Sequence, residues 1–110
     1  MVVVAEQHLC WPTPIGSVVV DIGESTGALL VDAPSQREGA EIEIRRCGTQ
    51  WTGTHVAVRE RHVSNRVFFA GLFSALESGV YEIRWRDDDK GIRKVLHIAP
   101  ASVTETSLPR

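Results

Sequence analysis

The sequence predicts an all-β protein, a single antiparallel β-sandwich of seven or eight strands. Segments in which apolar and polar residues alternate recur along the chain, and turn-forming residues separate them at roughly ten-residue intervals. No stretch of about ten residues or more keeps the ~3.6-residue apolar period of an amphipathic helix. A third signal is a corner between two strands near Gly79.

This corner is the most specific feature of the sequence. An apolar strand end leads into a short polar turn, and a second strand follows in which Tyr81, Ile83 and Trp85 alternate with charged residues. Gly79 can adopt the backbone angles that turn one strand toward the next. Tyr81 would then enter the core with its hydroxyl free to bond the backbone of the corner, which favours two packed sheets. A plain hairpin with a core tyrosine is the alternative.

The strands follow from local composition. Residues 17–22 are rich in β-branched side chains, residues 41–45 alternate strictly, and residues 67–73 are apolar on both faces. Residues 54–63 form the longest candidate, and Ser64-Asn65 after it has the length of a hairpin turn. The remaining strands are predicted at residues 28–31, 81–86 and 92–98, with residues 2–4 as the eighth candidate.

The predicted core takes one apolar face from each strand. Its members are Val18, Val20, Leu30, Ile42, Ile44, Val56, Val58, Phe69, Leu72, Leu76, Tyr81, Ile83 and Trp85.

The chain divides into an extension, one domain and a tail. Its 110 residues suffice for one domain with a modest core. Two prolines, Pro12 and Pro14, favour an extended connector, so residues 1–14 are predicted to form an N-terminal extension. The sandwich is predicted over residues 15–98, and the small, polar residues 99–110 are predicted to be a disordered tail.

Net charge and the lengths of the apolar runs indicate which classes of protein the sequence does not match. A net charge of -2 does not indicate a nucleic-acid binder, and no apolar run approaches the ~20 residues that span a membrane. The first residues lack the basic start and long apolar stretch of a signal peptide. We therefore expect a cytoplasmic protein with reduced thiols, no nucleic-acid partner and no cofactor.

One set of residues has metal-ligand chemistry: His8, Cys10 and Cys47, with His55 more distant. Thiolate and imidazole suit zinc or copper, but the spacing matches no common site. A disulfide between Cys10 and Cys47 is the other use of these thiols.

A hydrolase would need a serine or cysteine beside a histidine and a carboxylate. Glu60 and His62 share a strand face, whereas His55 lies on the opposite face. The sequence lacks a nucleophile elbow, so an enzyme is not favoured.

Five residues are candidates for binding. Trp11 and Trp51 lie in connectors, where an exposed tryptophan either anchors a partner or caps the sandwich. Arg59 and Arg61, like Arg84 and Arg86, form short basic ladders, which either pair with glutamates or bind an anion. Phe68 lies in the strand with two apolar faces, which is either a central strand covered on both sides or one that keeps a face for a partner.

Three segments resemble transthyretin-like (prealbumin-like) β-sandwich domains: residues 39–44, residues 54–58 and the motif Phe73-x-x-Leu76-x-x-Gly79-x-Tyr81-x-Ile83. The resemblance covers residues 15–98, and it implies a transthyretin-like or immunoglobulin-like fold. The whole pattern also resembles short uncharacterised actinobacterial proteins. The family's hydrolases end in Tyr-Arg-Gly-Ser, whereas this chain ends in Ser107-Leu108-Pro109-Arg110, so the resemblance does not imply that activity.

These observations favour a non-catalytic binding or protein-interaction module, either self-associating or an accessory subunit of a larger complex. A small metal-binding protein and a hydrolase are the alternatives, and no small-molecule ligand is indicated.

Overall fold

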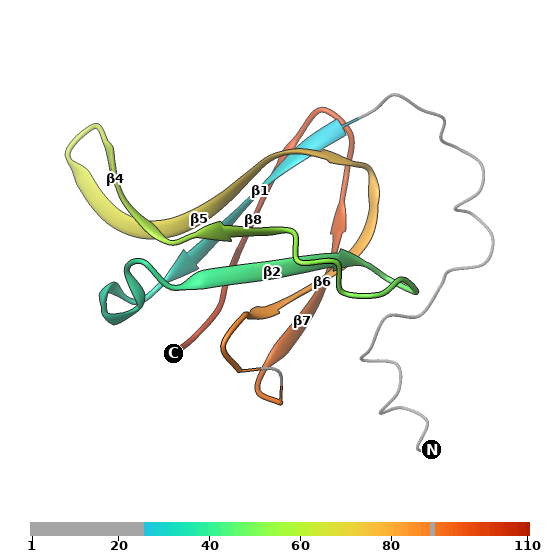
Figure 1. Ribbon diagram of the computed structural model, residues 1–110. Helices are drawn as coiled ribbons and strands as arrows, with labels where there is room; N and C mark the ends of the chain where they lie inside the picture. The colour runs from blue at the N-terminus through green and yellow to red at the C-terminus, as the bar shows by residue number, and fades with distance from the viewer. Residues whose placement is uncertain (1–25, 89) are drawn as a thin grey trace, which may run out of the picture.

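Two four-stranded sheets face each other in a sandwich (Figure 1), in a computed structural model that describes residues 26–88 and 90–110. Sheet A has the strand order β4-β5-β1-β8, and sheet B has the order β3-β2-β6-β7. The strands are β1 (Thr26–Ala33), β2 (Glu41–Arg46), β3 (His55–Ala57), β4 (Arg59–Val63), β5 (Arg66–Glu77), β6 (Gly79–Trp85), β7 (Arg93–Ile98) and β8 (Val103–Ser107). One short 3-10 helix, η1 (Ser35–Arg37), follows β1. The prediction of an all-β sandwich is confirmed.

The predicted extension over residues 1–14, the strand at residues 17–22, and the core residues Val18 and Val20 lie outside the described residues.

The corner between β5 and β6 is a tyrosine corner, as predicted. The Tyr81 hydroxyl donates a hydrogen bond to the Glu77 carbonyl at 2.8 Å and accepts one from Arg46 Nη1 at 3.0 Å. Arg46 Nη2 also donates to the Ser78 carbonyl at 3.2 Å. A Cβ on Gly79 would lie 2.8 Å from that same Nη2 atom, so a side chain here would displace the guanidinium. Glycine thus makes room for the arginine that holds the corner.

The segment predicted as one long strand is two strands in different sheets. β3 pairs with β2 in sheet B, and β4 pairs with β5 in sheet A. Between them Val58 is fully buried, and its backbone is bonded to the loop before β2. Its N–H donates a hydrogen bond to the Ala40 carbonyl at 2.8 Å, and its carbonyl accepts one from the Gly39 N–H at 2.9 Å. The alternation of side chains continues through Val58, which is why sequence alone does not reveal the change of sheet.

The C-terminal residues form a strand, which corrects the prediction of a disordered tail. β8 pairs with β1 in parallel, while the other strand pairs are antiparallel. Leu108 is fully buried in the core, and Trp85 Nε1 donates to the Pro109 carbonyl at 2.7 Å. A polar, threonine-rich segment shows little apolar period, but the open edge of β1 supplies the hydrogen bonds that its backbone needs.

The core confirms most of the predicted residues. Ile42, Ile44, Val58, Tyr81, Ile83 and Trp85 are buried, and Val56, Phe69 and Leu76 pack against them. The prediction that Leu30 and Leu72 lie in the core is wrong, because the large apolar side chains buried in these two strands are Leu29 and Val31 of β1 and Phe73 of β5. The register places Leu30 opposite Leu72, and side chains alternate along a strand, so this pair faces outward. Both strands are apolar on both faces, so sequence alone does not show which face turns inward.

Replacing Leu108 with alanine is expected to lower the free energy of unfolding by about 2–5 kcal/mol, because it opens a cavity under β8. Urea denaturation followed by tryptophan fluorescence measures the change. An unchanged midpoint would mean that this residue is not part of the core.

Replacing Tyr81 with phenylalanine is expected to cost about 1–2 kcal/mol, because the Glu77 carbonyl and Arg46 each lose a hydrogen-bond partner. Thr52→Val is the control, since it removes a hydroxyl that contacts Thr54 at the exposed surface. Equal urea midpoints for the two variants would contradict the structural role of the corner.

Candidate functional site

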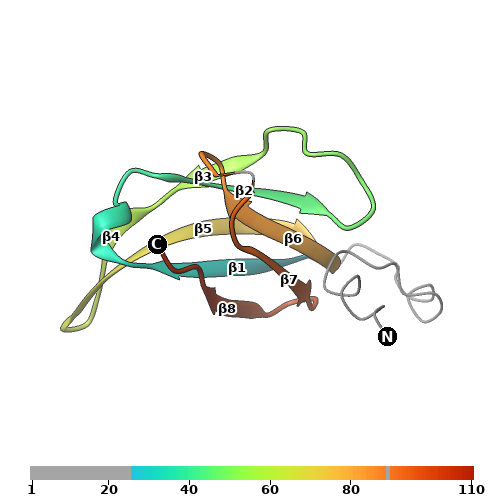
Figure 2. The same cartoon turned by 90° about the horizontal axis from the view of Figure 1, so that it is seen from below.

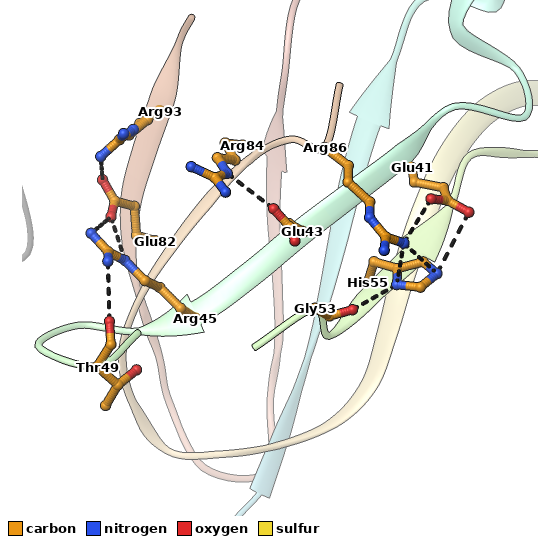
Figure 3. A network of polar contacts seen from close by, with 10 residues as sticks. All are labelled: Glu41, Glu43, Arg45, Thr49, Gly53, His55, Glu82, Arg84, Arg86 and Arg93. Carbon is orange, nitrogen blue, oxygen red and sulfur yellow. Dashed lines mark hydrogen bonds and ion pairs between the residues drawn. The ribbon is translucent and has the colours of Figure 1, made fainter. Parts of the chain in front are cut away.

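The outer face of sheet B carries a network of glutamates and arginines (Figure 3). Because Ile42, Ile44 and Ile83 point into the core, the residues between them on β2 and β6 point outward. The register of these strands sets Glu43 opposite Arg84 and Arg45 opposite Glu82. Each pair joins opposite charges across neighbouring strands, the favourable arrangement.

Two carboxylates of this network are buried although they lie on the outer face. Arg45 donates to Glu82 Oε1 through Nε at 2.9 Å and Nη2 at 2.6 Å, and Arg93 Nη1 lies 3.8 Å from Glu82 Oε2. Arg84 Nε donates to Glu43 Oε1 at 3.0 Å. The side chain of Glu82 is 0% exposed and that of Glu43 is 8% exposed. A buried charge is stable only when it is paired, which these arginines provide.

Trp51 covers these arginines. It lies in the loop between β2 and β3, and its ring centroid is 3.9 Å from the guanidinium of Arg84, 4.6 Å from that of Arg45 and 6.0 Å from that of Arg93. Such stacking attracts the cation to the ring face and shields it from water. The candidate binding residue Trp51 is therefore half-buried and caps a polar layer on sheet B.

Arg86 extends the network to the exposed end of the sheet. Its Nη1 lies 2.9 Å from Glu41 Oε1, and His55 Nε2 lies 3.5 Å from Glu41 Oε2. The interpretation of Arg84 and Arg86 as partners of glutamates is thereby confirmed. An anion at this face would have to displace those carboxylates.

The hairpin formed by β4 and β5 brings together three of the predicted binding residues, Arg59, Arg61 and Phe68. Its tip projects away from the rest of the sandwich in both views (Figures 1 and 2). Arg61 lies opposite Phe68 in the register, and its Nε donates to the Ala70 carbonyl at 3.1 Å. The guanidinium of Arg66 lies 4.9 Å from the Phe68 ring centroid.

The arginines of this hairpin differ from those of sheet B. Arg59, Arg61 and Arg66 form no ion pair in the part of the chain that the structure describes, whereas Arg45, Arg84 and Arg86 each bind a glutamate. Within residues 59–70, the projecting part of the hairpin, the one acid is Glu60, which contacts His62 Nε2 at 2.9 Å. The hairpin therefore presents unneutralised positive charge.

The hairpin tip is also apolar. Val63 is 56% exposed and Val67 is 55% exposed. In the register Val63 lies opposite Arg66 and Val67 opposite His62, so the two valines are on opposite faces of the hairpin. Val67 belongs to the apolar strand that the sequence predicts as a partner surface. Val63 and Arg66 are not among the predicted binding residues, because the apolar run gives no sign that β5 continues beyond the sandwich.

The two histidines on which the alternative of a hydrolase depends lie in different sheets. His55 lies on β3 in sheet B, and His62 lies on β4 in sheet A. Glu60 and His62, which the sequence places on one strand face, are in contact, with Glu60 Oε2 2.9 Å from His62 Nε2. Within residues 26–88 and 90–110, neither histidine hydrogen-bonds to a serine, threonine or cysteine side chain.

Of the three predicted metal ligands, the structure describes Cys47. Cys47 is disulfide-bonded, and a sulfur in that state is not a thiolate ligand. His8, Cys10 and Trp11 lie outside the described residues, among which no cluster of three metal-ligating side chains occurs.

Comparisons with protein-family models, with curated proteins and with solved structures return no match. Among the described residues, no helix is long and apolar enough to cross a membrane.

Replacing Glu82 with alanine is expected to lower the free energy of unfolding by about 3–5 kcal/mol, because Arg45 loses its buried partner. Glu41→Ala is the matched control, since it removes the same side chain from the same sheet at a site that is 42% exposed, and it should cost less than about 1 kcal/mol. Chemical denaturation at neutral pH measures both. Similar losses of unfolding free energy in the two variants would show that burial of the carboxylate does not increase its contribution to stability.

Proposed function

We propose that the protein is a non-catalytic protein-interaction module that binds an acidic partner surface through the β4–β5 hairpin. The observation that carries this proposal is the combination of three unpaired arginines with two exposed valines on one projecting element. Exposed apolar side chains beside arginine are typical of the centre of an interface. The paired arginines of sheet B offer no such surface.

The fold class that we propose is immunoglobulin-like. With β1 as strand B, the order β4-β5-β1 corresponds to D-E-B, and β3-β2-β6-β7 corresponds to C′-C-F-G. The tyrosine corner then lies between strands E and F, its usual place in such domains. β8 occupies the position next to β1 where strand A would pair. This order supports an immunoglobulin-like over a transthyretin-like arrangement.

The charge of the hairpin favours a different protein as partner over a second hairpin. Residues 59–70 contain three arginines and one glutamate, a net charge of +2 with histidine neutral, while the whole chain carries -2. Two hairpins docked on each other would place like charges side by side, which disfavours that dimer. A partner with acidic residues around an apolar centre would satisfy both features. The protein then acts as an accessory subunit of a larger complex.

The interaction is tested with two variants of the full chain, Val63→Asp/Val67→Asp and Arg59→Glu/Arg66→Glu. Each is expected to lower the amount of specifically bound protein at least about tenfold, because a desolvated apolar contact or a complementary charge is lost. The measurement is quantitative mass spectrometry of proteins that immobilised wild type and variants retain from an extract of the source organism.

Ile92→Asp and Arg110→Glu are the matched controls, since they change an exposed apolar residue and an exposed arginine away from the hairpin. Both should retain the same proteins as the wild type. If the hairpin variants fold normally and also retain those proteins, the hairpin is not the binding surface.

A further inference from the structure

The outer face of sheet A is apolar at its centre. Leu30 of β1 and Leu72 of β5 lie opposite each other, point outward and are partly exposed. Val103 of β8 is 64% exposed and lies opposite Ala28, which precedes Leu30 by two residues and so shares its face. The outer face of a sheet is usually polar where water covers it, as it is on sheet B. An apolar centre on such a face indicates a surface that another molecule covers.

Opposite charges flank this apolar centre. Ala70 points outward from β5, as Leu72 does, because side chains alternate along the strand. Arg59 of β4 lies opposite Ala70 on one side, and Asp32 of β1 lies opposite it on the other. Glu105 of β8, on the same face, adds a second acid beyond β1. The face is therefore basic on its β4 side and acidic on its β1 and β8 side.

The two charges nearest the centre are not neutralised within the described fold. Over residues 26–88 and 90–110, neither Arg59 nor Asp32 forms an ion pair. They do not pair with each other, since β5 lies between their strands and the strands are about 10 Å apart. Each is thus available to an opposite charge on another molecule.

We propose that two copies of the chain associate through the outer faces of their A sheets, about a two-fold axis that runs parallel to the strands between β1 and β5. This rotation sets Leu30 of each copy over Leu72 of the other, because the two residues are register partners. It also sets Asp32 of each copy over Ala70 of the other, beside Arg59. The small side chain of Ala70 leaves room for the carboxylate. Two ion pairs then flank an apolar centre of four leucines.

The charge layout selects both the occupant and the axis. A face that is basic on one side and acidic on the other complements a second copy of itself when the copy is turned about the strand direction. A two-fold axis across the strands would instead set β4 over β4 and bring Arg59 over Arg59, which repel each other. Sheets that pack face to face lie about 10 Å apart with their strands roughly aligned, which the first axis allows and which these side chains can span.

The tip of the β4–β5 hairpin lies outside this interface. β1 ends at Ala33, opposite Phe69, so Val63, Arg66 and Val67 lie beyond the end of β1. The dimer engages Arg59 at the base of the hairpin and leaves the tip of each copy free. This inference therefore goes beyond the proposed binding of an acidic protein by the hairpin and does not depend on it.

The first test is sedimentation velocity of the full chain over a range of concentrations. The wild type should dimerise, with a dissociation constant that rises with salt because the ion pairs are screened. Arg59→Asp and Asp32→Arg should each raise that constant at least about tenfold, because like charges then face each other. A wild type that is monomeric at every concentration would overturn the proposal, as would single variants that dimerise like the wild type.

An equal mixture of the Arg59→Asp and Asp32→Arg variants should recover the wild-type affinity. One copy then carries acids at both positions and the other carries arginines at both, so each contact across the axis joins opposite charges. A change of stability within one chain cannot be repaired by a second chain, so recovery on mixing reports contact between copies. A mixture that stays monomeric would overturn the proposed axis.

Leu72→Asp tests the apolar centre, and Ile92→Asp is its control. Leu72→Asp should be monomeric at concentrations where the wild type is a dimer, because it buries a charge in the interface. Ile92 lies between β6 and β7 in sheet B and is 47% exposed, so its variant should remain dimeric. Equal dimerisation of the two variants would overturn the proposal. If Leu72→Asp fails to fold, the surface charge variants and their mixture still decide.

The hairpin variants separate this proposal from the proposed function. Val63→Asp/Val67→Asp should remain dimeric while it loses the proteins that the hairpin retains. Leu72→Asp should retain those proteins while it loses the dimer, so each proposal can fail without the other. A monomeric Val63→Asp/Val67→Asp variant would locate the contact between copies at the hairpin tip and overturn the dimer proposed here.

Discussion

The bond from the Tyr81 hydroxyl to the Glu77 carbonyl, supported by Arg46, is the constraint on which the two sheets depend. It fixes the turn by which the chain leaves β5 in sheet A and enters β6 in sheet B. Once this turn is set, the alternation of β6 places Ile83 and Trp85 in the core and Glu82 and Arg84 on the outer face. The core and the polar layer of sheet B are thus two consequences of one corner.

The change of sheet at Val58 separates two kinds of arginine. β3 ends against β2, and β4 continues with β5 beyond the sandwich, where no second sheet covers it. Arginines on β2 and β6 lie opposite glutamates and under Trp51, so their charge is neutralised within the fold. On the projecting hairpin, Arg61 bonds to a backbone carbonyl and Arg66 stacks on Phe68, and within the described part of the chain no carboxylate pairs with either. Topology, rather than residue type, decides which arginines remain available to a partner.

Sheet edges connect the fold with the proposed behaviour of the protein. Ionisable residues on β4 discourage strand pairing there, which suits a hairpin that binds through side chains rather than through its backbone.

The sequence by itself determined the class of fold, the tyrosine corner and the inward face of β2 and β6. In these strands apolar and charged residues alternate strictly, so only one face can be buried. It also identified Arg59, Arg61 and Phe68, but not that they lie together on a free hairpin. Tertiary structure alone decided the inward faces of β1 and β5, which are apolar on both sides, so Leu29 and Phe73 rather than Leu30 and Leu72 fill the core. Tertiary structure likewise ordered the tail, because β8 gains its hydrogen bonds from β1, a contact between segments far apart in the sequence.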